Sequence, residues 1–184
     1  MKIIGITGPQ AAGKGAVVEY LVKKLGFVHY SVSGYLTEQL QAQGQEINRD
    51  TMRVLADSLR AKFGPAYSIE QLYSQAEKNG QNAIIESIRT VGEVEALKKK
   101  SDFLLLSVDA DQRLRYERAI KRNSVKDQIT WEHFQEQEAL EANNTDPNKG
   151  NILACQKLAD IQLDNNGSLE ELYEQIDRVV GMNG

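Results

Sequence analysis

Short apolar runs recur along the chain, and the longer segments between them carry apolar residues every three or four positions. Several of the runs are almost continuous in apolar side chains, as in strands that are covered on both faces of a sheet. We therefore expect five strands, at Lys2–Thr7, Phe27–Ser31, Ala83–Ile88, Phe103–Val108 and Ile161–Leu163.

The longer segments have the spacing of amphipathic helices. The last of them follows Ser168, whose hydroxyl is typical of a helix N-cap. Strands that alternate with helices predict an α/β fold with a five-stranded parallel sheet and helices on both of its faces. The expected helices are Gly15–Leu25, Gly34–Gln43, Arg49–Lys62, Ile69–Lys78, Val91–Lys100, Asp111–Arg122, Trp131–Ala142, Asn151–Leu158 and Leu169–Val180.

Composition restricts the class of protein. A chain of 184 residues with 41% hydrophobic and 26% charged residues is typical of one globular domain, here 1–184. The net charge of −4 provides no basic field for nucleic acid. No apolar run reaches the length of a membrane span. A glycine-rich segment begins at residue 8, where a signal peptide would have its apolar region, so we expect no signal peptide. We expect a cytoplasmic monomer or small homo-oligomer.

The first strand leads into the sequence Gly8-Pro9-Gln10-Ala11-Ala12-Gly13-Lys14-Gly15, which has the P-loop spacing G-x4-G-K. Glycines let consecutive backbone N–H groups approach phosphate oxygens, and the following helix adds its positive N-terminal end. A chance glycine turn is the alternative. The phosphate-binding residues are predicted to be Gly8, Gln10, Ala11, Ala12, Gly13, Lys14, Gly15 and Ala16, with Lys14 also acting on the transferred phosphoryl group.

The residue after the P-loop lysine has no hydroxyl. Most P-loops place Ser or Thr there to bind Mg²⁺, whereas this chain has Gly15 followed by Ala16. A metal ion would therefore be held mostly by phosphate oxygens and water, which suits Mg²⁺ because it keeps several waters. The single cysteine, Cys155, excludes an internal disulfide and a cysteine-based zinc site.

Ligands of parallel α/β sheets bind beyond the carboxyl ends of the strands. Glu86 lies toward the end of the third strand and is placed to hold the water shell of Mg²⁺, while Arg89 is placed to reach a phosphate or the transferred group. A solvated strand end and a surface salt bridge are the alternatives. Ser31 and Ser33 follow the second strand and are candidate contacts for an acceptor, unless Ser33 serves only as a helix cap.

Arginines cluster on two of the expected helices. Arg115, Arg118 and Arg122 share a helix face, and Arg118 and Arg122 are the predicted catalytic pair because phosphoryl transfer needs several donors. Arg49 and Arg53 are candidates for binding the acceptor phosphate. For each of these arginines, a solvated position on an amphipathic helix is the alternative.

Together these residues resemble the nucleoside monophosphate kinase family of P-loop kinases. The resemblance covers most of the chain, including Gly8–Gly15, Ile85–Arg89 and the closing Asp164–Ser168, with features of deoxynucleoside monophosphate and dephospho-CoA kinases. It implies ATP and Mg²⁺ as cofactors, with the adenine base near Asn165 and Gly167. It also implies acceptor-binding helices at about 31–80 and a short lid at about 121–142.

The chain departs from the adenylate kinase pattern at two places. Thr37 stands where that group has an arginine, and Gln135–Glu138 occupies a segment where it has further arginines. The expected function is ATP-dependent phosphoryl transfer to a small phosphorylated metabolite, chiefly a nucleoside or deoxynucleoside monophosphate. A nucleotide-binding regulatory module or weak ATPase is the alternative, and dephospho-CoA kinase-like activity is a further one.

Overall fold

The structure is a computed structural model that describes residues 1–121, 130–142, 144, 146 and 149–181, with the backbone alone at 49, 50, 53, 140 and 141. Its centre is a five-stranded sheet in the order β2-β3-β1-β4-β5, in which all neighbouring strands are parallel. The five predicted strands are confirmed, with bounds that shift by one or two residues. They are β1 (Ile3–Thr7), β2 (Val28–Ser31), β3 (Ala83–Glu86), β4 (Phe103–Asp109) and β5 (Ile161–Asp164).

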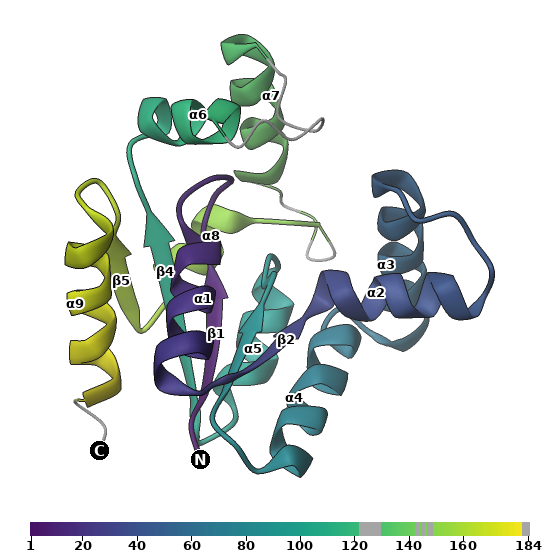
Figure 1. Cartoon of the computed structure of the whole chain (residues 1–184). Helices are drawn as coiled ribbons and strands as arrows, with labels where there is room; N and C mark the ends of the chain where they lie inside the picture. The colour runs from purple at the N-terminus through teal and green to yellow at the C-terminus, as the bar shows by residue number, and fades with distance from the viewer. Residues whose placement is uncertain (122–129, 143, 145, 147–148, 182–184) are drawn as a thin grey trace.

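Helices cover both faces of the sheet, as the sequence predicted (Figure 1). Helices α1 and α9 pack together on one face, and α4, α5 and α8 lie on the other. Helices α2 and α3 extend beside β2, and α6 and α7 lie beyond the carboxyl end of β4. The described helices are α1 (Lys14–Leu25), α2 (Val32–Ala42), α3 (Arg49–Phe63), α4 (Tyr67–Asn79), α5 (Val91–Lys98), α6 (Gln112–Lys121), α7 (Trp131–Ala142), α8 (Ile152–Lys157) and α9 (Leu169–Gly181).

The sheet separates two hydrophobic clusters, because successive side chains of a strand point to opposite faces. Along β1, Ile3 belongs to the cluster under α4 and α5, whereas Ile4 and Ile6 belong to the cluster under α1 and α9. Every residue of β1 is buried. This continuous burial explains the unbroken apolar run at the start of the sequence and fixes the loop that follows it.

The second helix begins two residues earlier than the sequence indicated. Ser31 is its N-cap, with Oγ accepting a hydrogen bond from the N–H of Gly34 at 3.3 Å, so the helix starts at Val32. The prediction of a start at Gly34 is wrong because the cap lies at the last residue of β2, and Ser33 lies in the first turn. The cap at Ser168 is confirmed by its Oγ, which accepts from the N–H of Glu171 at 3.2 Å. Among the described residues, no helix is long and apolar enough to cross a membrane.

Candidate nucleotide-binding site

The loop between β1 and α1 is held close to the ends of two neighbouring strands. Gly8 has φ 141° and Gly13 has φ 114°, a backbone region that disfavours side chains. A Cβ on Gly8 would lie 2.2 Å from the carbonyl oxygen of Val108, and one on Gly13 would lie 2.1 Å from Nδ2 of Asn165. The two bracketing glycines are therefore required by close packing against β4 and the loop after β5.

Lys14 is folded back onto this loop. Its Nζ donates to the carbonyl oxygens of Gly8 at 2.6 Å and of Pro9 at 2.7 Å. An ammonium group carries three donors on a flexible stem, so these contacts can be exchanged for phosphate oxygens without moving the backbone. The structure thus places Lys14 over the loop that its sequence position predicted.

Two further carbonyl oxygens of the loop are bound by side chains from outside it. Arg115 Nη1 donates to the oxygen of Gln10 at 3.2 Å, and Asn165 Nδ2 donates to the oxygen of Ala12 at 2.7 Å. Because these two carbonyl oxygens are occupied by donors outside the loop, they are not available to repel an anion bound to the loop. The loop therefore has its negative dipole ends neutralised by groups that come from α6 and from the loop after β5.

The loop N–H groups complete this polarity. In the described part of the chain, the N–H groups of Gln10, Ala11 and Gly13 have no hydrogen-bond partner. Ala11 has φ 59°, a left-handed conformation of the kind that brings successive N–H groups toward one point. Bound carbonyl groups together with open N–H groups make the loop a cradle for an anion.

Glu86 lies beside this cradle, at the end of the strand next to β1. Its Oε2 is 3.6 Å from His29 Nε2, and its Oε1 accepts a hydrogen bond from Ser31 Oγ at 3.1 Å. The contact with His29 is the main cause of a pKa below the ordinary value for Glu86; burial opposes it, and Ser31 and the positive charge of Lys14 support it. Glu86 is therefore an ionised, half-buried carboxylate on the side of the P-loop.

The main chain of Arg89 is fixed on both sides. Its N–H donates to Glu93 Oε2 at 2.8 Å, and its carbonyl oxygen accepts from the N–H of Asn151 at 2.8 Å. Glu93 is buried and caps α5 together with Thr90, and Arg60 Nη2 lies 3.5 Å from its other oxygen. Arg89 thus carries an exposed side chain on a main chain that two hydrogen bonds hold in place.

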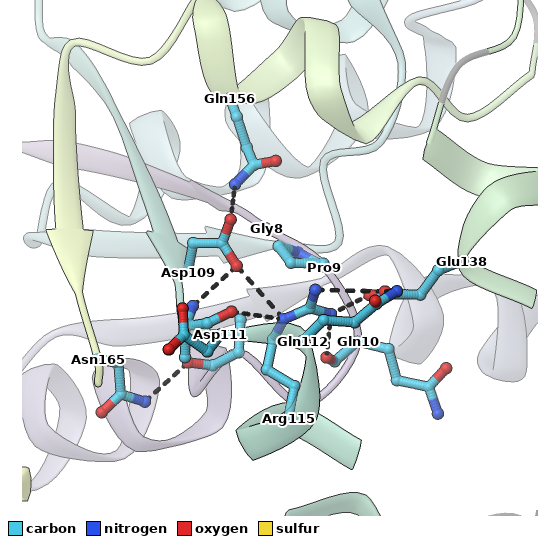
Figure 2. Close-up of polar contacts among 12 residues, drawn as sticks. Gly8, Pro9, Gln10, Asp109, Asp111, Gln112, Arg115, Glu138, Gln156 and Asn165 are labelled. Atoms are coloured by element: carbon cyan, nitrogen blue, oxygen red, sulfur yellow. Dashed lines mark hydrogen bonds and ion pairs between the residues drawn. The ribbon is translucent and has the colours of Figure 1, made fainter. Parts of the chain in front are cut away.

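Arg115 has a different role from the one its helix face suggested. It is buried and links the P-loop to two carboxylates, with Nε 3.4 Å from Asp109 Oδ1 and the guanidinium paired with Glu138 (Figure 2). Burial lowers the pKa of Arg115, and Asp109 opposes this shift. Asp109 is held further by Gln156 Nε2, which donates to Oδ2 at 2.9 Å.

Arg118 lies one turn after Arg115 on the same helix. It is partly buried, and its Nη1 is shielded from solvent without a hydrogen-bond partner in the described part of the chain. A buried guanidinium donor without an acceptor costs free energy, so this position favours a ligand that brings oxygen atoms. Arg122 and the first part of the predicted lid lie outside the described residues.

The loop after β5 is fastened to the P-loop. Asn165 is 3% exposed, its N–H donates to the carbonyl oxygen of Asp109 at 2.8 Å, and its Oδ1 has no partner among the described groups. Gly167 lies against the capping carboxylate of Glu171, where a Cβ would be 1.8 Å from Oε2. Asn165 thus supports the phosphate loop directly, and a contact of Asn165 or Gly167 with a base stays a prediction.

The predicted acceptor residues lie on the other side of Glu86. Ser31 bonds to Glu86 and caps α2, and Ser33 stands in the first turn of that helix. Thr37, the position that differs from the adenylate kinase pattern, donates its hydroxyl to the carbonyl oxygen of Ser33 at 2.8 Å. Arg49 and Arg53 lie in the first two turns of α3, of which the backbone is described.

Sequence reasoning misses the roles of Asp109, Glu138 and Asn165 in building the loop. Asp109 follows a predicted strand, but no pattern indicates that it faces an arginine. Glu138 stands out in the sequence only because its segment lacks the arginines of the adenylate kinase pattern. Its contact with Arg115 depends on how α7 folds back over α6, which no local spacing records.

A glycine-bracketed loop between a buried strand and a helix, with a lysine folded over it, defines the class of P-loop proteins. A family model described as an AAA domain matches residues 4–145 of the chain. The chain therefore belongs to this AAA domain family.

Similar proteins cover nearly the whole chain. The UPF0200 protein of Staphylothermus marinus is 29% identical over 171 residues, which span 93% of this chain and 87% of that protein. Among solved structures, TT1252 from Thermus thermophilus has a TM-score of 0.68 at 19% identity. The match covers 100% of this chain and 98% of the TT1252 chain. Shikimate kinase from Aquifex aeolicus has a TM-score of 0.53 at 16% identity, with coverage of 98% and 97%. These likenesses show the P-loop kinase-like α/β fold.

Proposed function

We propose that the protein transfers a phosphoryl group from ATP to a small phosphorylated metabolite, chiefly a nucleoside or deoxynucleoside monophosphate. The observation that carries the proposal is the polarity of the phosphate loop. The carbonyl oxygens of Gln10 and Ala12 are bound by outside donors, and open N–H groups remain for an anion. Membership of the AAA domain family and the P-loop kinase-like fold support nucleotide binding at this loop.

The triphosphate of ATP would lie on Gly8–Gly15. Lys14 would exchange its carbonyl contacts for the β- and γ-phosphates, and Arg118 would pair its open Nη1 with a phosphate oxygen. Phosphoryl transfer depends mainly on positioning and on donors for the charge of the equatorial oxygens, so the protein needs no nucleophile of its own.

Mg²⁺ fits the donors that the site offers. The described residues contain no group of three or more His, Cys, Asp or Glu that would hold a metal ion alone. One ionised carboxylate, Glu86, stands on the side of the loop, and Mg²⁺ is commonly bound through one or two carboxylates, phosphate oxygens and water. When bound, the ion would neutralise charge on the β- and γ-phosphates.

The acceptor would enter between β2 and α3. Ser31 and Ser33 lie at the start of α2, and Arg49 and Arg53 lie on the next helix. Arg89 would bind the acceptor phosphate or the transferred group from its fixed main chain. Because its main chain is held in place, Arg89 is suited to stabilise the charge that develops on the transferred phosphoryl group in the transition state.

A nucleotide-binding regulatory module or weak ATPase is the second candidate. At the two places where the adenylate kinase pattern has arginines, this chain has Thr37, which bonds to its own helix, and a segment whose Glu138 pairs with Arg115. Neither place supplies a positive charge to the site. The chain thus has fewer positive groups for the transferred charge than an adenylate kinase pattern implies. Dephospho-CoA as the acceptor is a further possibility within the kinase proposal.

The decisive experiment measures ADP release with ATP and Mg²⁺ against a panel of nucleoside and deoxynucleoside monophosphates and dephospho-CoA. Acceptor-dependent release supports the kinase, and the responding compound identifies the acceptor class. Lys14→Ala is the control, because loss of its ammonium group should remove most ATP binding in calorimetry. Unchanged affinity in Lys14→Ala would place the nucleotide elsewhere, and absence of release across the panel would favour the binding module.

A further inference from the structure

Helix α7 is linked to the phosphate loop by an apolar cluster and by a polar contact. Phe134 is fully buried and forms one hydrophobic cluster with Ala11 of the loop and Ala119 of α6. Trp131 and Tyr116 flank this contact, with ring centroids 5.2 Å apart. A helix distant in sequence therefore shares one hydrophobic cluster with the left-handed residue of the P-loop.

One turn after Phe134, Glu138 makes a polar contact with the same region. Its two oxygens pair with the guanidinium of Arg115, and Arg115 Nη2 lies 3.2 Å from Oε2. Gln112 Nε2 adds a hydrogen bond to Oε2 at 2.7 Å. The exposed fractions of the Arg115 and Glu138 side chains are 8% and 12%, so the pair is largely removed from water.

The geometry of Arg115 shows what this pairing achieves. Nη1 contacts Glu138 and also donates to the carbonyl oxygen of Gln10 at 3.2 Å (Figure 2). Nε donates to the carbonyl oxygen of Ala110 at 2.8 Å. A planar fork that is bound at both ends has one orientation left, and in that orientation it holds the Gln10 carbonyl group away from the phosphate cradle.

We propose that Glu138 is a positioning residue for the phosphate loop: it orients Arg115, and Arg115 holds the Gln10 carbonyl group in the state that binds phosphate. The inference rests on the proposed nucleotide site. It assigns α7 a direct effect on polyphosphate affinity, through one side chain that does not touch the ligand. The carboxylate acts here through geometry, since its negative charge alone would weaken the binding of an anion.

The test compares Glu138→Ala with Glu136→Ala. Both changes remove one carboxylate from the same helix, but the Glu136 side chain is 74% exposed and contacts His133 rather than the loop. The probes are ADP and tripolyphosphate, measured by calorimetry without metal so that Glu86 takes no part. Tripolyphosphate has no base or ribose, so it reports on the phosphate loop alone.

We expect Glu138→Ala to weaken the binding of both probes about tenfold, the equivalent of one hydrogen bond to a charged group. Glu136→Ala should change their affinities less than about twofold. Glu138→Gln keeps an oxygen that accepts from Arg115 and should recover part of the loss. Thermal unfolding of each variant separates the loss of affinity from a loosening of α7. Loosening alone would lower the melting temperature without lowering the affinity for tripolyphosphate.

The binding results separate the two proposals. If wild-type protein binds both probes and Glu138→Ala binds them equally well or more tightly, Glu138 is no positioning residue. If Glu138→Ala does not fold, Glu138→Leu, which fills the same space but offers no acceptor to Arg115, takes its place, and undiminished binding by that variant leads to the same conclusion. If wild-type protein binds neither probe, the proposed nucleotide site is wrong, and the inference fails with it.

Discussion

Asn165→Asp is a sharp test of how the phosphate loop is supported. The two side chains have nearly the same shape, but the substitution replaces the Nδ2 donor by an oxygen. In the wild-type protein this donor lies 2.7 Å from the carbonyl oxygen of Ala12, in a side chain that is 3% exposed. An ionised carboxylate at this position would face a carbonyl oxygen, and in the described part of the chain no hydrogen bond joins the Asn165 side chain to a cationic group.

The expected cost depends on pH. A buried, uncompensated charge costs about 3 kcal/mol or more, whereas a protonated carboxyl group restores the hydrogen bond to Ala12. The folded-state pKa of the introduced group is therefore raised above its unfolded value of about 3.9. Below the unfolded-state pKa the variant should be about as stable as the wild-type protein. Between the unfolded-state and folded-state pKa values, its free energy of unfolding should fall relative to the wild-type protein by about 1.4 kcal/mol per pH unit.

Urea denaturation of the variant and the wild-type protein at matched pH values measures this difference. We expect a loss of about 1.5 kcal/mol near pH 5 and a plateau of about 3 kcal/mol from roughly pH 7 upward. Asn48→Asp is the matched control, because Asn48 is an exposed N-cap of α3 and a carboxylate caps a helix as well as an amide does. A pH-independent loss, or one below about 0.5 kcal/mol at pH 8, would show that the Asn165 amide is not the donor that supports the loop.

Two other predictions use neighbouring features of the fold. Gly15→Ser introduces the hydroxyl that most P-loops carry. Apart from the adjoining residues and the backbone of α1, no atom of the described chain lies within 4 Å of the added Cβ, so we expect a stable variant. Its ADP affinity should rise with added Mg²⁺ more than that of the wild-type protein. An equal Mg²⁺ dependence of the two proteins in calorimetry would mean that this position does not face the metal. Burial raises the pKa of Cys155 to about 12, so its thiol should react with a disulfide reagent at pH 8 only as fast as the protein opens. Reaction at the rate of the urea-unfolded chain would contradict that burial.

The sequence determined much of the molecule. Five apolar runs became five parallel strands, because a run without alternation is compatible with a strand covered on both faces. The spacing of Gly8, Gly13 and Lys14 placed the phosphate loop, since only glycines fit the close approach to β4 and to the loop after β5. The strand ends also made Glu86 and Arg89 candidates for the site, because polar residues after buried strands converge at one edge of a parallel sheet, and their roles stay predictions.

The tertiary structure decided how these parts meet. The sheet inserts β3 between β1 and β2, an order that the sequence of elements leaves open, and this order brings Ser31 beside Glu86. The packing of α6 and α7 over the loop turned Arg115 inward onto Glu138 and the Gln10 carbonyl group. Local spacing records which residues share a helix face, but the partner of that face is fixed by packing between elements far apart in the chain, where burial makes an unpaired charge too costly to leave.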